Sequence, residues 1–272
     1  MTAPATLHHE RLGAVAATAT VLFTHGIYGS GANWRTIARQ VVAARPSLAA
    51  VLVDLRLHGR SSAGPPPHTV AACTADVAAL VAQLGADGPP VVGAVGHSFG
   101  GKVILGLDRL PHRVVLDSTP SARPDAWDRP GNTVRLVWDS LVEVGPRHRR
   151  RDDFVAALVG RGHPRPLAQW LAMNLRPDGD GLVLGLDLPA VAELLRDYYA
   201  VDLWHHLERP TGAITMVVAE RGDTVSAADL ARLERAPVAV TTHVIPGASH
   251  WLHLDAAAEV VAHLTAALAP AG

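Results

Sequence analysis

Short apolar runs alternate with longer helical patterns through the first 116 residues. The strand candidates are Val21–His25, Ala49–Leu55, Val91–Val95 and His112–Leu116. Each is nearly all apolar, which is typical of a strand that is buried on both faces. Helical patterns follow the first three, at residues 34–44, 70–84 and 100–110; in the second of them Val77, Leu80, Val81 and Leu84 recur at the spacing of one helix face. The alternation predicts an α/β fold, a mostly parallel sheet with helices on both faces.

This rhythm changes after Ser118. From Thr119 to Pro210 the pattern predicts helices and loops but no strand, with candidate helices at Asn132–Val144, Asp152–Arg161, Pro166–Leu175 and Leu188–Tyr199. The alternation then returns, with strands at Ile214–Ala219 and Thr242–Ile245 and helices at Ala227–Arg235 and Ala256–Leu268. A crossover between two parallel strands needs only about a dozen residues, so the excess must form a unit of its own. We therefore expect a core domain of residues 1–118 and 211–272 and a helical cap of residues 119–210.

Composition narrows the class of protein. The 272 residues are 49% hydrophobic and 18% charged, which allows a large core, and 24 basic against 25 acidic residues give a net charge of −1. That balance predicts no nucleic-acid partner. The single cysteine, Cys73, excludes an intramolecular disulfide. No secretory signal and no apolar run of about 18 residues is evident, so we expect a cytoplasmic protein with no membrane span.

Gly96-His97-Ser98-Phe99-Gly100 fits the pattern G-x-S-x-G at the point where a predicted strand gives way to a predicted helix. A serine on such a sharp turn is strained, and its hydroxyl projects above the sheet. Small residues are needed on both sides of it, and Gly96 and Gly100 supply them. The N–H of Phe99 then lies at a helix N-terminus, where it can stabilise an oxyanion. The strand–turn–helix context favours a nucleophilic Ser98 over an ordinary glycine-rich turn.

Two further loops follow predicted strands and carry candidate catalytic groups. The loop His25–Gly29 comes after the first strand, where this kind of hydrolase supplies its second oxyanion N–H, and we assign that N–H to Ile27. The loop after the last strand holds His250, which can reach a serine hydroxyl as general base, with His253 as its local competitor. No acidic ligand stands beside these two histidines, so we expect no metal.

The acid that orients the histidine has two candidates. Asp117 directly follows the strand before the predicted cap, and Asp223 lies just after the strand that follows the cap. Counting back from Val225, the usual acid position in the later loop falls on Gly222, so Asp223 is one residue out of register. The spacing favours Asp117, with Asp223 as the alternative acid, although Asp117 could also cap the turn at Ser118–Pro120.

These residues resemble the α/β-hydrolase family, and more specifically the YbfF-type bacterial esterases and their mitochondrial relative, abhydrolase domain-containing protein 11. The matching stretches run across most of the chain, at Thr24–Ser30, Asp54–Ser61, Gly96–Lys102, Leu171–Leu175 and Gly247–Trp251. The resemblance implies an α/β-hydrolase fold with a helical cap over the active site and no cofactor. It also implies an acid after the strand that precedes the cap, in agreement with Asp117. The stretch Glu220–Asp223 departs from the family pattern.

Taken together, the residues predict a serine hydrolase that cleaves carboxylic esters or thioesters through a catalytic triad. Ser98 attacks the acyl carbonyl, His250 carries the proton, and Asp117 orients the histidine. The N–H groups of Ile27 and Phe99 bind the oxyanion. The expected partner is a small-molecule ester or thioester, and the sequence does not fix the oligomeric state.

The expected acyl pocket is apolar and aromatic. Tyr28, Phe99 and Trp251 are candidates from the core, and Trp170 and Trp204 are candidates from the cap. Other chemistry on the same fold stays open, namely lactone hydrolysis, carbon–carbon bond hydrolysis or cofactor-free peroxidation. A serine at position 98 argues against dehalogenase and epoxide hydrolase chemistry, which use an aspartate there. A ligand-binding protein without catalysis is the least favoured reading.

Overall fold

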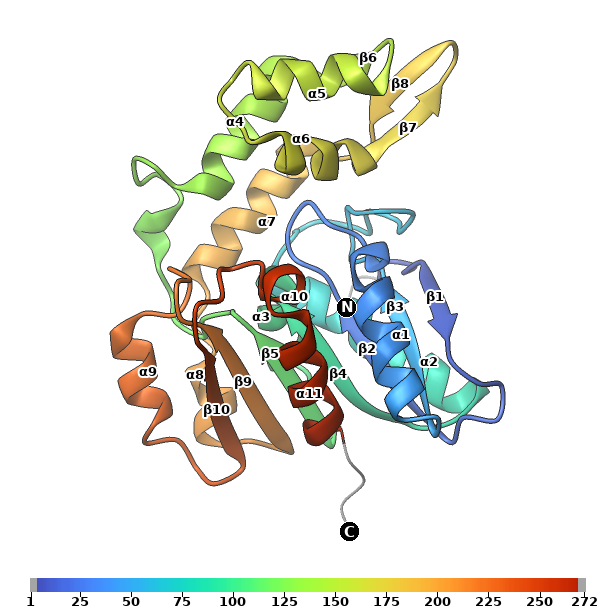
Figure 1. Cartoon of the computed structure of the whole chain (residues 1–272), viewed down its shortest axis with the longest axis vertical. Helices are drawn as coiled ribbons and strands as arrows, with labels where there is room; N and C mark the ends of the chain where they lie inside the picture. The colour runs from blue at the N-terminus through green and yellow to red at the C-terminus, as the bar shows by residue number, and fades with distance from the viewer. Residues whose placement is uncertain (1–3, 269–272) are drawn as a thin grey trace.

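The computed structural model describes residues 4–268, and its main feature is a seven-stranded sheet with the strand order β1-β3-β2-β4-β5-β9-β10 (Figure 1). All neighbouring strands are parallel except β1, which pairs antiparallel with β3. The sheet strands are β1 (His9–Leu12), β2 (Ala19–Thr24), β3 (Leu48–Val53), β4 (Val91–His97), β5 (His112–Leu116), β9 (Ala213–Ala219) and β10 (Val240–Ile245). The core helices are α1 (Arg35–Ala44), α2 (Val70–Asp87), α3 (Phe99–Leu105), α9 (Ala227–Leu233), α10 (Leu252–Asp255) and α11 (Ala257–Ala267), with a 3₁₀ turn η1 (Gly31–Trp34).

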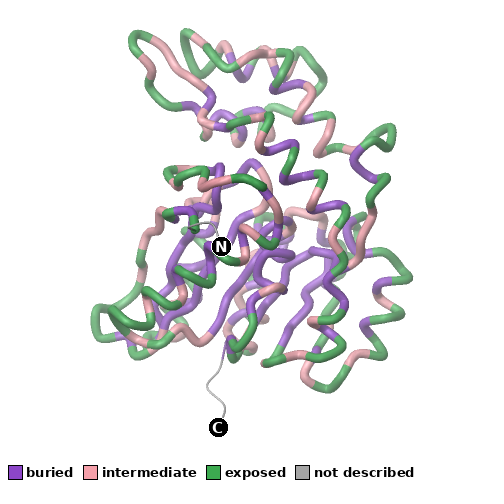
Figure 2. The backbone as a smooth tube through the Cα atoms, turned by 180° about the vertical axis from the view of Figure 1, so that it is seen from behind, coloured by how far each residue is buried: buried purple, intermediate pink, exposed green. Residues whose placement is uncertain are grey.

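This architecture confirms the predicted α/β class. The central strands β2 and β4 are apolar and almost completely buried, which Figure 2 shows as a continuous buried sheet. Strand β1 was missed because its sequence, His-Glu-Arg-Leu, is polar and only half-buried, as an edge strand can be. Since parallel strands end at the same edge of a sheet, the loops after β2, β4, β5, β9 and β10 meet there.

Two apolar layers cover the two faces of the sheet. One layer joins α1 and α11 to the strands, and in it the rings of Phe23 and Trp34 lie 5.5 Å apart. The other joins α2 and α3 to the opposite face and continues without a break into the cap, where Leu141 and Leu194 are fully buried. Burying a large apolar side chain stabilises a fold by about 1.5–3 kcal/mol, so this shared layer holds cap and core together.

The chain between β5 and β9 leaves the sheet and forms a cap above its carboxyl edge (Figure 1). Its elements are η2 (Pro124–Ala126), α4 (Thr133–Val144), β6 (Arg147–His148), α5 (Arg151–Val159), α6 (Arg165–Leu171), η3 (Ala172–Asn174), β7 (Leu175–Asp178), β8 (Gly181–Leu184), α7 (Leu188–Ala200) and α8 (Trp204–Glu208). The helices α4, α5 and α7 match the predicted ranges within two residues.

The small antiparallel sheet β6-β8-β7 in the cap contradicts the expectation of no strand there. The predicted helix 166–175 instead ends at Leu171, and β7 follows. Pro177 lies within β7, where its restriction of the residue before it favours the extended backbone of that strand. Gly179, with φ 61°, makes the tight turn to β8. In the sequence, the signal for this hairpin was a glycine between the two short segments that form β7 and β8.

Within the described residues, helix α2 is long and apolar enough to cross a bilayer by length and composition alone. In this fold it packs on the sheet, and its residues Cys73, Val77 and Leu80 are buried in the core. A core helix passes the same test as a membrane span. The absence of a membrane span therefore stays a prediction.

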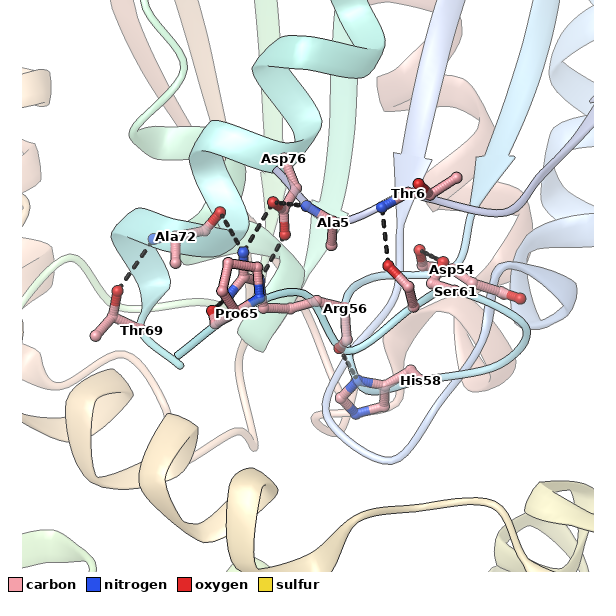
Figure 3. A network of polar contacts seen from close by, with 11 residues as sticks. Ala5, Thr6, Asp54, Arg56, His58, Ser61, Pro65, Thr69, Ala72 and Asp76 are labelled. Atoms are coloured by element: carbon pink, nitrogen blue, oxygen red, sulfur yellow. Dashed lines mark hydrogen bonds and ion pairs between the residues drawn. The ribbon is translucent and has the colours of Figure 1, made fainter. Parts of the chain in front are cut away.

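The loop after β3 carries a buried polar network (Figure 3). Through His58 this network also supports the loop after β2. Arg56 binds Asp76 with two short contacts, Nε to Oδ2 at 2.5 Å and Nη2 to Oδ1 at 2.8 Å, and both side chains are almost fully buried. The carbonyl of Arg56 accepts a hydrogen bond of 2.8 Å from His58 Nδ1. His58 Nε2 is then left as an acceptor, and it receives the Tyr28 N–H at 3.1 Å.

This network requires a neutral His58. Burial, and then the neighbouring His25, lower the pKa of His58 to about 3. His25 is also buried, burial lowers its pKa, and its Nε2 accepts the Leu55 N–H at 3.0 Å. In the unfolded chain each histidine takes up a proton as the pH falls through about 6.5, whereas in the folded chain both rings stay neutral at that pH. Their contribution to stability is thus present above pH 6.5 and is lost as the pH falls toward the folded-state pKa.

Replacing His58 by Gln should therefore make the protein less sensitive to acid. Between about pH 6.5 and pH 5 the wild type loses unfolding free energy through this residue, and His58→Gln should reduce that loss by about 2 kcal/mol. Urea unfolding at the two pH values measures it. His205→Gln, which changes an exposed histidine, is the control and should keep the wild-type loss. A wild-type acid dependence in His58→Gln would show that His58 does not titrate in this way.

Candidate active site

Ser98 stands between β4 and α3 in a strained backbone conformation, with φ 51° and ψ −115°. Positive φ is costly for a residue with a side chain, so the surrounding structure must enforce it. A Cβ on Gly96 would lie 2.4 Å from the carbonyl oxygen of Gly100, and a Cβ on Gly100 would lie 2.6 Å from that of His25. Only glycine fits these two places. The sequence Gly-x-Ser-x-Gly thus folds into a tight elbow above the sheet.

Two backbone N–H groups near Ser98 have no hydrogen-bond partner within residues 4–268. They belong to Ile27 and to Phe99, the first residue of α3. The N–H groups in the first turn of a helix have no partner in the helix itself. The loop that carries Ile27 is fixed on its other side, because the Tyr28 N–H is held by His58 and the Tyr28 hydroxyl donates to the Val134 carbonyl at 3.0 Å. This arrangement can supply two donors to a developing oxyanion.

His250 and Asp117 come together from the loops after β10 and β5. His250 Nδ1 lies 2.6 Å from Asp117 Oδ2, and Asp117 is completely buried. The other oxygen, Oδ1, accepts the Ala219 N–H at 3.0 Å. His97 Nε2 donates to the carbonyl of His250 at 2.8 Å and fixes the backbone of that loop. With Nδ1 on the carboxylate, Nε2 of His250 is left free to take a proton from a hydroxyl.

The alternative acid lies elsewhere in the same loop cluster. Asp223 makes no hydrogen bond to His250 in the described part of the chain, and its carbonyl accepts a long contact of 3.4 Å from Arg123. A Cβ on Gly222 would lie 2.8 Å from Asp117 Oδ2. The carboxylate of Asp117 therefore occupies the space in front of position 222. The structure brings Asp117, and not Asp223, to the histidine.

The cavity at Ser98 has two connected arms. The larger arm has a volume of about 390 Å³ and is mainly apolar. Its lining comes from both the core and the cap and consists of His25, Gly26, Ile27, Tyr28, Asn33, Trp34, His97, Ser98, Thr133, Val134, Leu136, Val137, His163, Pro164, Leu167, Trp170, Asp223, His250, Trp251 and His253. The smaller, about 280 Å³, shares Ile27, Ser98 and His250 with it and adds Phe99 and Tyr198. Both arms therefore reach the serine and the histidine.

Trp204 does not lie in either arm, and this corrects the expectation that it lines the acyl pocket. Its Nε1 donates to Ser121 Oγ at 2.8 Å, and the guanidinium of Arg232 stacks 4.1 Å from the centre of its ring. It packs where the cap joins the core. Tryptophan content alone could not show this, because a helix in a cap buries aromatic residues on several sides.

His253, the competing histidine, is buried with its ring 5.5 Å from the ring of Trp34. Burial, and then His250, lower its pKa to about 4, so it is neutral at ordinary pH. Its Nδ1 has no hydrogen-bond partner in the described structure. Across residues 4–268, no group of three or more histidine, cysteine, aspartate or glutamate side chains is arranged to hold a metal ion.

Sequence reasoning missed two residues beside the elbow. Tyr198, on α7, lines the smaller arm of the cavity together with Ser98, and burial raises the pKa of Tyr198 to about 12. Lys102, on α3, is fully buried and donates from Nζ to three backbone carbonyls. Burial lowers the pKa of Lys102 to about 7, while those three oxygens favour the ammonium form. The one usable signal was that Lys102 is the only lysine in the chain.

Comparison with known proteins agrees with this geometry. The model of the alpha/beta hydrolase family matches residues 21–263. The sn-1-specific diacylglycerol lipase ABHD11 of Danio rerio is 26% identical over 261 residues, which cover 92% of this chain and 78% of that protein. Lipase LipV of Mycobacterium tuberculosis is 36% identical over 141 residues, which cover 50% of this chain and 48% of that protein.

A solved structure described as a marine microorganism esterase has the same fold. It superposes with a TM-score of 0.82 at 20% sequence identity, covering 97% of this chain and all of that chain. The elbow serine, the sheet topology and the family match over most of the chain agree with one another. This protein belongs to the alpha/beta hydrolase family and is a hydrolytic enzyme of that type.

Proposed function

We propose that the protein hydrolyses carboxylic esters or thioesters through an acyl-enzyme on Ser98. The observation that carries the proposal is the 2.6 Å contact between His250 Nδ1 and Asp117 Oδ2, in a cavity that also holds the strained Ser98. This contact sets the histidine tautomer that a general base needs. A buried carboxylate beside the ring also stabilises the imidazolium that forms when the base takes a proton.

In the proposed reaction, Ser98 Oγ attacks the acyl carbonyl while its proton passes to His250 Nε2. The carbonyl oxygen becomes an oxyanion and accepts hydrogen bonds from the N–H groups of Ile27 and Phe99. The tetrahedral intermediate collapses, and His250 gives its proton to the departing alcohol or thiol. Water then enters, loses a proton to His250, and releases the acid by the same steps in reverse.

The substrate proposed for this site has an apolar acyl group. The larger arm of the cavity is lined by Tyr28, Val137, Leu167 and the edge-to-face pair Trp170 and Trp251, whose ring centres lie 5.2 Å apart. An apolar cleft with few polar groups suits an acyl chain. The relatives named as lipases support this class. Turnover of lactones or of carbon–carbon substrates in a substrate panel would instead support one of the alternative chemistries.

Ser98→Ala tests the nucleophile. The smaller side chain fits the elbow, so the variant should unfold at nearly the wild-type temperature, yet it should lose more than about 10³-fold in turnover of p-nitrophenyl esters. Steady-state kinetics and a thermal melt measure the two effects. Wild-type turnover in a folded Ser98→Ala protein would rule out the acyl-enzyme on this residue.

A pair of matched substitutions tests the acid. Asp117→Asn removes the charge and keeps the shape, so it should lower turnover by about 10⁴-fold, the loss seen when a triad histidine loses its orienting carboxylate. Asp223→Asn makes the same chemical change at the residue that does not bind His250, and it should lower turnover by less than about tenfold. Turnover of p-nitrophenyl butyrate by both variants gives the comparison. The opposite ranking would assign the acid to the later loop.

The acyl pocket is tested by two tryptophans of the cap. Trp170→Ala enlarges the apolar arm, so it should change the ratio of turnover between octanoate and acetate esters by about tenfold, as a few buried methylenes do. Trp204→Ala removes a buried ring outside the cavity, so it should lower the melting temperature and keep that ratio. If Trp170→Ala lowers activity equally on all chain lengths, Trp170 does not shape the acyl pocket.

A further inference from the structure

The loop that carries the Ile27 N–H contains a strained residue. Residues 26–29 form a tight turn, which is closed by a hydrogen bond of 3.1 Å from the Gly29 N–H to the Gly26 carbonyl. Tyr28, the third residue of this turn, has φ 62°. Turns with positive φ at this place usually carry glycine or asparagine there, because most side chains make that conformation costly. The surrounding structure must therefore hold Tyr28 in place.

All three polar groups of Tyr28 are hydrogen-bonded. Its N–H donates to His58 Nε2 in the core at 3.1 Å. Its carbonyl accepts a hydrogen bond of 2.8 Å from Asn174 Nδ2, and its hydroxyl donates to the Val134 carbonyl at 3.0 Å. Asn174 ends η3 and Val134 lies in α4, so two of the three hydrogen bonds come from the cap. Core and cap thus both bind the residue next to Ile27.

The side chain of Asn174 is itself fixed within the cap. Its Nδ2 also donates to the Leu171 carbonyl at 3.2 Å, and its backbone carbonyl accepts the Gly185 N–H at 2.9 Å. Both partners of Nδ2 are carbonyl oxygens, which can only accept, so the nitrogen of the amide must face them. Within residues 4–268, Asn174 lines neither arm of the cavity at Ser98. Any effect of Asn174 on the reaction must therefore pass through Tyr28.

We propose that Asn174 is a positioning residue of the oxyanion hole, through which the cap sets the direction of the Ile27 N–H. The inference rests on the proposed acyl-enzyme and on Ile27 as an oxyanion donor. The turn has only four residues, so a change in φ at Tyr28 must be compensated at Ile27. That compensation rotates the peptide that carries the Ile27 N–H. An oxyanion donor is effective only within a few tenths of an ångström of its best distance, so such a rotation weakens it.

The effect falls equally on both halves of the reaction. Acylation and deacylation each pass through a tetrahedral intermediate, and the negative charge on its oxygen is the group that the Ile27 N–H binds. The acyl carbonyl of the bound substrate carries no such charge. A misdirected donor should therefore lower kcat and leave KM nearly unchanged.

Two substitutions of Asn174 test the role of its amide. Asn174→Leu keeps the size and removes the donor, so kcat for p-nitrophenyl acetate should fall about tenfold, less than for complete loss of an oxyanion donor, with KM within about twofold of wild type. Asn174→Asp keeps the shape but places a carboxylate oxygen against two carbonyls, so kcat should fall at least as far. Wild-type kcat in a folded Asn174→Leu protein would overturn the proposal.

A pair of inhibitors separates an effect on the oxyanion from an effect on packing. With an alkyl trifluoromethyl ketone, Ser98 Oγ adds to the carbonyl carbon, its proton passes to His250, and the carbonyl electron pair moves to the oxygen, which becomes an oxyanion. The matched methyl ketone binds without this addition. Asn174→Leu should raise the Ki of the trifluoromethyl ketone about tenfold and change that of the methyl ketone by less than about twofold. Equal changes in both Ki values would show that Asn174 acts through packing alone.

Arg151 provides a matched control within the same part of the cap. Its Nη1 donates to the carbonyl of Ala172 in η3, and in the described structure it makes no hydrogen bond to Tyr28. Arg151→Met should keep kcat and both Ki values within about twofold of wild type. If Arg151→Met and Asn174→Leu weaken the trifluoromethyl ketone equally, the cause is a loosened η3, and Asn174 is not a positioning residue.

The wild-type protein distinguishes failure of this inference from failure of the proposed function. It should bind the trifluoromethyl ketone more than about 100-fold more tightly than the methyl ketone, as expected when a tetrahedral adduct forms. Equal affinity for the two ketones in the wild type would contradict the proposed acyl-enzyme chemistry. A wild-type preference that Asn174→Leu retains in full would leave that chemistry intact and refute only the positioning role.

Discussion

The close approach of three backbone segments at Ser98 determines most of this structure. Strand β4, helix α3 and the loop after β2 meet with so little space that Gly96 and Gly100 cannot carry a side chain. The strain that this meeting imposes on Ser98 is supported by apolar layers on both faces of the sheet. It places the serine, the N–H of Phe99 and the loop of Ile27 at one cavity. The geometry of the candidate site is thus a consequence of backbone packing.

The position of the acid extends this constraint to the cap. Asp117 directly follows β5, and only a few residues later the chain enters the cap at Ser121, whose carbonyl accepts a hydrogen bond from Lys102 on α3. Glycine at position 222 leaves the later loop without a side chain where the carboxylate of Asp117 lies. The segment after β5 therefore both contacts His250 and leads into the cap. Cap residues such as Val137 and Trp170 line the same cavity as Ser98.

The sequence allowed the prediction of features that depend on neighbouring residues in the chain. The elbow follows from its glycine spacing, the strands from their apolar runs, and the preference for Asp117 from a register count that ends on Gly222. Apart from the pairing of Asp117 with His250, several features that depend on distant residues were missed. His58 holds the Tyr28 N–H from 30 positions away, and Lys102 binds carbonyls as far as Val201. The small cap sheet and the place of Trp204 were missed for the same reason, since neither has a periodic pattern that separates it from helix or core.

Covalent labelling with a fluorophosphonate, followed by peptide mapping, tests the central claim most directly. The account predicts a single phosphonylated residue, Ser98, with loss of esterase activity in proportion to labelling. It also predicts slow labelling when Asp117 is replaced by Asn, since the histidine then lacks the carboxylate that orients it. Labelling of another residue, or continued ester hydrolysis by fully labelled protein, would contradict the account.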